Sequence, residues 1–150
     1  MITRADLLAF LRSHRYAVQS SVHPEGGPQS AVVGIAVSDD FEIVFDTLEN
    51  SRKAQSLREH PEISFVFADL TGKDERTVQC EGVVDQSTSA DLDRLIDLYL
   101  EVFPAGRERQ KWPGLIYVTT RPTWLRYCDY NQNPPQIIEF DRETLRDLKC

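Results

Sequence analysis

A short polar segment near the middle of the chain combines two cations with hydroxyl groups. It runs from Asp46 and Thr47 through Ser51 to Arg52 and Lys53, between a strand-like stretch and a helix-like one. A helix N-terminus presents free backbone N–H groups and a partial positive charge, and both stabilise a bound phosphate. Arg52 can add a bidentate fork and Lys53 a mobile charge. These residues predict a phosphate cradle suited to a mononucleotide.

A second interpretation of the same segment stays open on spacing alone. Serine caps followed by basic residues occur on many surface helices that bind no ligand. Cations in a first helical turn are mildly unfavourable there, which favours a nearby anion without proving one.

Other chemistry finds little support in the sequence. His14, His23 and His60 are isolated from one another, with no metal-ligand spacing. The chain has no Walker loop, dinucleotide glycine fingerprint or nucleophile elbow. The sequence therefore predicts no metal site, no hydrolase and no kinase, and it identifies no catalytic side chain.

Composition places the chain among single-domain globular proteins. Its 150 residues are 41% hydrophobic and 27% charged, which predicts one domain over residues 1–150. A formal charge of −7 repels nucleic acid. Charged residues interrupt the first twenty positions, and no apolar run reaches the roughly 18 residues of a membrane span. The three cysteines form no Cys-x-x-Cys pair. We therefore expect a cytoplasmic protein with no membrane or nucleic-acid partner.

Hydrophobic periodicity predicts mostly strands, with helices at three places. A capped helix is expected from Thr3 to near His14, a short one after Asn50 or Ser51, and a long one from Ser87 or Ser89 to Pro104. We expect a charged loop over 106–113 and a polar tail after 140. The strands expected from alternation and apolar runs cover residues 16–22, 30–37, 41–47, 63–68, 77–84, 115–120, 124–130 and 137–140. Short turns between them favour antiparallel pairing, and closure into a small barrel avoids exposed edges.

The central segment also resembles a known family. Phe45 to Ala54, followed by Leu57, Pro61 and a strand from Ile63, is similar to the pyridoxamine 5'-phosphate oxidase pattern: Phe-x-Thr, three residues, Ser-Arg-Lys, and a short helix that ends before Asn/His-Pro. Glu81-Gly82 resembles the Val-Glu-Gly strand of that family.

The resemblance implies a mainly β fold with flanking helices, a six- to seven-stranded antiparallel split β-barrel of the FMN-binding type. It implies a homodimer with FMN in a groove at the subunit interface, and a flavin-dependent oxidoreductase acting on an unknown small molecule. By this resemblance Arg52 and Lys53 bind the phosphate, and Thr47 and Ser51 hydrogen-bond phosphate or ribityl oxygens. The expected cofactor set further contains Asp46, the backbone of Val32 and Val33 along the isoalloxazine, Thr77 at the place of a flavin-contacting glutamine, and Trp112.

The aromatic residues of the last third have two interpretations. Trp112 or Tyr127 would stack on the flavin ring or substrate from the partner subunit, or would pack in a core or dimer interface.

The chain also departs from the true oxidases. It has Ala31 and Ala36 where the resemblance leads one to expect an arginine and a lysine that touch flavin, and no Arg-Leu-His-Asp-Arg segment follows Trp124. Vitamin B6 oxidation is therefore not expected. A non-catalytic module that binds or senses flavin, haem or a deazaflavin on the same fold is the alternative.

Overall fold

A curled antiparallel sheet forms the body of the molecule. The computed structural model describes residues 1–85 and 89–149. The strands of the described chain are β1 (Tyr16–Val22), β2 (Pro28–Gly34), β3 (Ala36–Val37), β4 (Ile43–Leu48), β5 (Glu62–Ala68), β6 (Arg76–Val84), β7 (Leu115–Asp129) and β8 (Gln136–Asp141). The mainly β prediction is confirmed.

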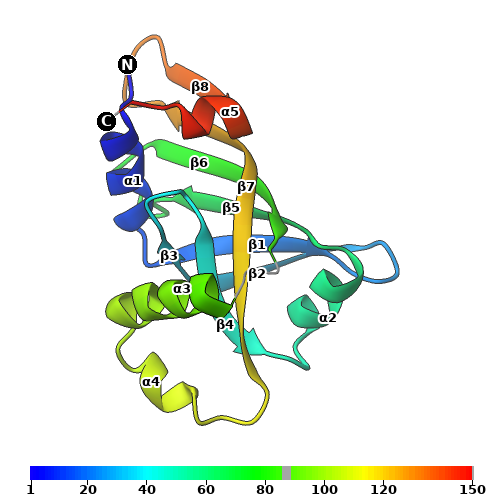
Figure 1. Cartoon of the computed structure of the whole chain (residues 1–150). Coiled ribbons are helices and arrows are strands. Elements are labelled where there is room, and N and C mark those ends of the chain that lie inside the picture. Colours follow the sequence, from blue (N-terminus) through cyan, green and yellow to red (C-terminus); the bar gives the residue numbers. More distant parts are fainter. Residues whose placement is uncertain (86–88, 150) are drawn as a thin grey trace.

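The strands follow the order β2-β1-β5-β6-β7-β4-β3, and β8 pairs with β7 beside this path. Every pairing is antiparallel. The sheet curls so that β1 and β2 lie across β4 and the first half of β7 (Figure 1). Because β2 ends the path, one side of its backbone has no strand partner within the described residues.

The structure joins and divides some predicted strands. The residues expected as one strand over 30–37 form β2 and β3, which are interrupted at Ile35. The next strand begins at Ile43 rather than Phe41, because Phe41 has a positive φ of 63° within a turn. The break predicted at Arg121-Pro122 is wrong: β7 continues through it, and a register shift opposite Glu81 and Gly82 places an irregularity there. Proline has no N–H to donate, and such bulges accommodate it.

Five helices flank the sheet in the described chain: α1 (Arg4–Arg12), α2 (Arg52–Glu59), α3 (Ser89–Val102), α4 (Gly106–Arg109) and α5 (Arg142–Arg146). Thr3 caps α1 in a capping box with Asp6, as the sequence predicted. The loop expected over 106–113 contains α4, and the expected polar tail contains α5, which Asp141 caps through the backbone N–H of Thr144. The alternative cap Ser87 lies outside the described residues.

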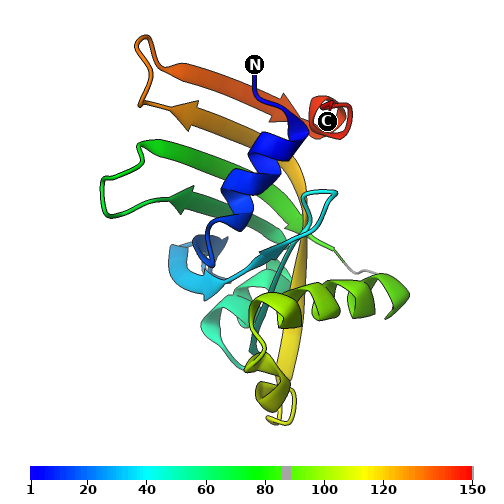
Figure 2. The ribbon, with the colours of Figure 1, turned by 90° about the vertical axis from the view of Figure 1, so that its left-hand side faces the viewer.

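Two hydrophobic clusters hold the elements together. In the larger one, Leu7 and Phe10 of α1 pack against inward-facing residues of the curled sheet such as Phe65. Figure 2 shows α1 crossing the hollow of the sheet. In the smaller one, Leu95 and Tyr99 of α3 pack against β3 and β4. Among the described helices, none combines the length and apolarity that a membrane crossing requires.

Candidate functional site

The predicted cradle forms where β4 turns into α2. Ser51 caps the helix: its hydroxyl accepts the backbone N–H of Ala54 at 3.2 Å. Its Oγ lies 3.0 Å from Thr47 Oγ1, and Lys53 Nζ donates to the same Thr47 oxygen at 3.4 Å. The structure thus brings Thr47, Ser51 and Lys53 into one hydrogen-bonded group at the N-terminus of α2. Neither Arg52 nor Lys53 has a carboxylate partner among the described residues.

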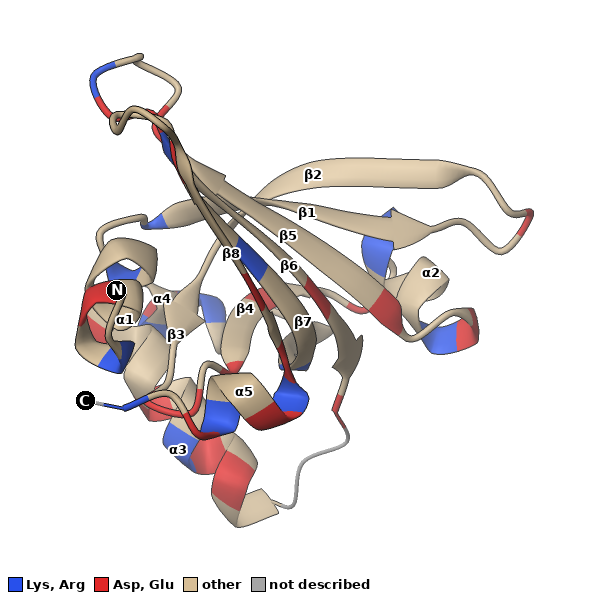
Figure 3. Cartoon of the chain, turned by 90° about the horizontal axis from the view of Figure 1, so that it is seen from above, with Lys and Arg blue, Asp and Glu red and all other residues tan. Residues whose placement is uncertain are grey.

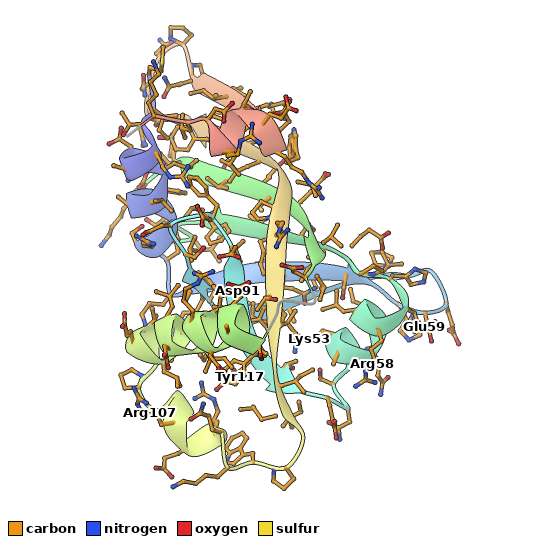
Figure 4. The ribbon with its side chains drawn as sticks, in the orientation of Figure 1. Lys53, Arg58, Glu59, Asp91, Arg107 and Tyr117 are labelled. Carbon is orange, nitrogen blue, oxygen red and sulfur yellow. The ribbon has the colours of Figure 1, made fainter. Side chains whose placement is uncertain are left out.

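A cavity of about 360 Å³ lies beside this group. Small-molecule pockets commonly have volumes of about 300–1,000 Å³. We call it the donor pocket. Its lining comes from β1 (Gln19, Ser21), the first half of β2 (Pro28, Gln29, Ser30, Ala31) and α2 (Arg52, Lys53). Basic residues at the beginning of α2 lie close to β1 (Figure 3). Lys53, near the start of α2, lies on the side of this helix that faces the sheet (Figure 4).

Three buried polar atoms of the donor pocket have no protein partner. They are Gln19 Nε2, Ser21 Oγ and Gln29 Nε2, each without a hydrogen bond to any described residue. Gln19 and Ser21 are only 1% and 5% exposed. Leaving a buried donor unsatisfied costs about 1–3 kcal/mol, so such groups in a native fold call for an explanation. A ligand that accepts hydrogen bonds would satisfy them.

The chemistry of the pocket suits the phosphate of FMN. It offers two cations, two amide N–H₂ groups and hydroxyls, and no Asp or Glu is among its described lining residues. A phosphate monoester is an anion that only accepts hydrogen bonds when fully ionised, which matches such a lining. The residues present therefore fit the group that the family resemblance implies.

Asp46 has a different environment from its neighbour Thr47. Successive strand residues point to opposite faces, and the Asp46 carboxylate faces α3 and α4. It accepts hydrogen bonds from the Tyr99 hydroxyl at 2.9 Å and from Arg109 Nε at 2.8 Å. Burial, together with the bond to Asp46, raises the pKa of Tyr99 above its ordinary value. The hydrogen bond to Asp46 likewise raises the pKa of Arg109. The carboxylate joins β4 to both helices.

Val32, Val33 and Thr77 are not among the described residues that line the donor pocket. The Val33 side chain is buried in the core, while Val32 is 69% exposed on the outward face. Thr77 pairs with Ala68 on the outward face of the same sheet. A ligand that reaches both the donor pocket and Val32 must therefore pass the unpaired edge of β2.

The two aromatic candidates have different environments. Tyr127 is buried, with its ring 6.0 Å from that of Phe10 in a T-shaped contact, so the core interpretation holds for it. Trp112 is 54% exposed in the loop after α4. That loop contacts the cradle loop, because the backbone N–H of Glu49 donates to the Gly114 carbonyl at 2.8 Å. Trp112 is therefore exposed on a loop that contacts the β4–α2 loop.

Sequence reasoning missed the polar residues of β1. The signal was present in the alternation of Ala17, Gln19 and Ser21, which share the inward face of β1. A glutamine and a serine at inward positions indicate a polar cavity where a core would otherwise lie. No group of three or more His, Cys, Asp or Glu side chains among the described residues is arranged to hold a metal ion.

Solved structures share this fold. A heme binding protein from Mycobacterium smegmatis superposes with a TM-score of 0.84 at 14% identity, over 100% of this chain and 62% of that one. The chain therefore spans less than two thirds of that protein. A pyridoxamine 5'-phosphate oxidase-related FMN binding protein from Nostoc punctiforme gives 0.70 at 17% identity, over 91% and 87%. HutZ, the heme storage protein from Vibrio cholerae, gives 0.69 at 14%, over 81% and 91%. These similarities show the fold alone.

A search of the curated proteins found no match. A family model gives the assignment: the one described as pyridoxamine 5'-phosphate oxidase matches residues 3–126, most of the chain. This range contains the curled sheet through most of β7, together with the cradle and the donor pocket. The chain belongs to the pyridoxamine 5'-phosphate oxidase family.

Proposed function

We propose that this protein binds FMN, with the phosphate in the donor pocket, and acts as a flavin-dependent oxidoreductase on a small molecule. One observation carries the proposal. Arg52 and Lys53 line a cavity together with buried donors that have no protein partner among the described residues. A fold that leaves such donors unpaired in a pocket without carboxylates is suited to an anionic ligand.

The residues of the chain would bind and orient the cofactor. Arg52 and Lys53 supply positive charge to the phosphate, and the Ser51 hydroxyl and the first N–H groups of α2 supply further donors. The unpaired edge of β2 offers backbone groups to the polar rim of a flat ring, in keeping with the predicted role of Val32 and Val33. Bound flavin supplies hydride transfer at its N5 atom.

A homodimer completes the proposal. Tyr16, Val32 and Val66 are 59%, 69% and 42% exposed on the outward face of β1, β2 and β5. The pairings place Val32 and Val66 on either side of Val18, so these side chains form one apolar surface. A second copy would cover this surface. It would also bring its own Trp112, which the sequence predicted to stack from the partner subunit, toward the edge of β2.

Haem is the main rival ligand, because two proteins of similar fold are named as haem binding or haem storage proteins. An imidazole would be its natural axial ligand. His14 bonds the Phe10 carbonyl and makes edge-to-face contacts with the Phe10 and Phe67 rings, and His23 lies at a hairpin tip. No histidine is among the described residues that line the donor pocket. The pocket therefore favours FMN or a phosphate-bearing deazaflavin, and a Soret band after reconstitution would instead identify haem.

The test compares FMN with riboflavin, which lacks the phosphate. We expect wild-type protein to bind FMN much more tightly, and Arg52→Ala/Lys53→Ala to weaken FMN binding at least about 100-fold by removing two charge-assisted contacts. Riboflavin binding should change little. The control is Lys73→Ala/Arg142→Ala, which removes the same charges from exposed sites elsewhere. Equal affinity for FMN and riboflavin would contradict the phosphate site.

Reduction of the bound flavin tests the enzymatic half of the proposal. We expect NADH, NADPH or a small-molecule donor to bleach the flavin absorbance anaerobically, and an acceptor to restore it. A bound flavin that no donor reduces would refute the oxidoreductase activity and support a non-catalytic binding module.

A further inference from the structure

Gln19 is an unusual residue for the inward face of β1. It is 1% exposed, and it lies between Ala17 and Ser21 on the side of the strand that faces the interior. Glutamine is seldom fully buried unless its amide is hydrogen-bonded. Its Nε2 nevertheless has no hydrogen-bond partner among the described residues.

The register of β1 and β2 places Gln19 against the donor pocket. Gln19 pairs with Ala31, and Ser21 pairs with Gln29. Gln19 and Ala31, whose side chain is small, both line the cavity with Arg52 and Lys53. Gln29 Nε2 and Ser21 Oγ, the other unpartnered buried atoms of this cavity, belong to the adjoining cross-strand pair. Two neighbouring pairs thus present unsatisfied groups to one space.

We infer that the Gln19 amide, with Ser21 and Gln29, binds the anionic end of the ligand from the sheet side, opposite the cations of α2. The inference rests on the proposed function for the identity of the ligand as FMN. In this site α2 supplies positive charge, while β1 and β2 supply uncharged hydrogen-bond donors from fixed strand positions. Donors on strands are held more rigidly than the long side chains of Arg52 and Lys53, so they select the shape of the bound oxyanion.

These unpaired buried groups lower the stability of the ligand-free protein. An unpaired buried amide is unfavourable, and replacing it with an apolar side chain of similar size removes that penalty. Gln19→Leu should therefore raise the melting temperature of the ligand-free protein. It should also weaken FMN binding about tenfold or more, because it removes one hydrogen bond to a charged acceptor. A glutamine with a purely structural role would give the opposite change in stability.

The experiment combines calorimetry, ligand titration and NMR. Gln19→Leu is compared with Gln79→Leu, the same change at an exposed outward position of β6. FMN, riboflavin and pyrophosphate are titrated into each protein, and the side-chain NH₂ resonances of Gln19 and Gln29 are followed in the wild type. The expected result is a stabilised Gln19→Leu protein, a selective loss of FMN affinity, unchanged riboflavin binding, and a shift of the Gln19 NH₂ signals with either anion.

The outcomes separate this inference from the proposed function. FMN binding that Gln19→Leu leaves intact, with no shift of the Gln19 signals, would overturn the inference while the flavin assignment stands. A wild type that ignores FMN but whose Gln19 signals shift with pyrophosphate would overturn the flavin assignment and support the donor role. Failure of both FMN and pyrophosphate to shift those signals would overturn the inference as well.

Discussion

The bonds between Asp46, Tyr99 and Arg109 lead to a prediction about the strand that carries Thr47. Asp46→Asn keeps the shape of the side chain but removes its charge, and its single amide oxygen can no longer give Tyr99 and Arg109 an acceptor atom each. A hydrogen bond to a charged group contributes about 1.5–3 kcal/mol. The Arg109 side chain is 28% exposed and can recover some hydration, so we take the lower part of that range, about 1.5–2 kcal/mol. For a chain of this length, the melting temperature should fall by about 3–8 °C.

The assay is calorimetry of the ligand-free protein, followed by FMN titration below the melting transition. Asp39→Asn is the control, because it removes the carboxylate from an ion pair with Arg12 in which Asp39 is 87% exposed. Its melting temperature should stay near that of the wild type. An Asp46→Asn protein as stable as wild type would refute the stabilising role of these bonds. A folded Asp46→Asn protein that loses FMN would show that Asp46 contributes to cofactor binding, as expected from the sequence.

Three further predictions concern other parts of the fold. Gly82→Ala should destabilise the protein by about 1–3 kcal/mol in chemical denaturation, because a Cβ there would lie 2.8 Å from the backbone oxygen of Arg121; unchanged stability would contradict the close approach. Val32→Glu should convert the proposed dimer to a monomer in sedimentation, and a dimer that persists would argue for another interface. The Arg76 guanidinium holds the pKa of Asp74 well below its usual range, so the ionised carboxylate stabilises the fold above about pH 4 and this contribution is lost as the pH falls further. Asp74→Asn should therefore lower the melting temperature at pH 7, and the difference from wild type should shrink by about pH 2; a difference that stays constant with pH would refute the pairing.

Local patterns in the sequence predicted most of the fold. The residue types from Tyr16 to Val22 suit a strand, and they predicted β1 with the bounds that the structure has. The capping box at Thr3 and the cap at Ser51 were visible because each depends on residues close in sequence. Continuity through Pro122 was not visible, since it depends on the bulge opposite Gly82 and therefore on pairing with β6.

The candidate site, too, was predicted where it depends on residues close in sequence and missed where it depends on packing between distant elements. Thr47, Ser51 and Lys53 were predicted together and lie together, because one short loop carries them all. The part of the site on β1 and β2 was missed. Gln19 and Lys53 line the same cavity only because α2 packs against β1 in the folded chain. Their spacing in the sequence does not indicate that contact. The sequence reading noted Ala31 as the loss of an expected cation, whereas the register shows a glutamine opposite it.

A crystal structure of the protein with FMN would test the central claim most directly. We predict the phosphate in the donor pocket, within hydrogen-bonding distance of Arg52, Lys53 and the Gln19 amide, with the ring passing the β2 edge toward Val32. Density for FMN at another site, or a donor pocket that holds no phosphate in a complex with bound flavin, would contradict the account.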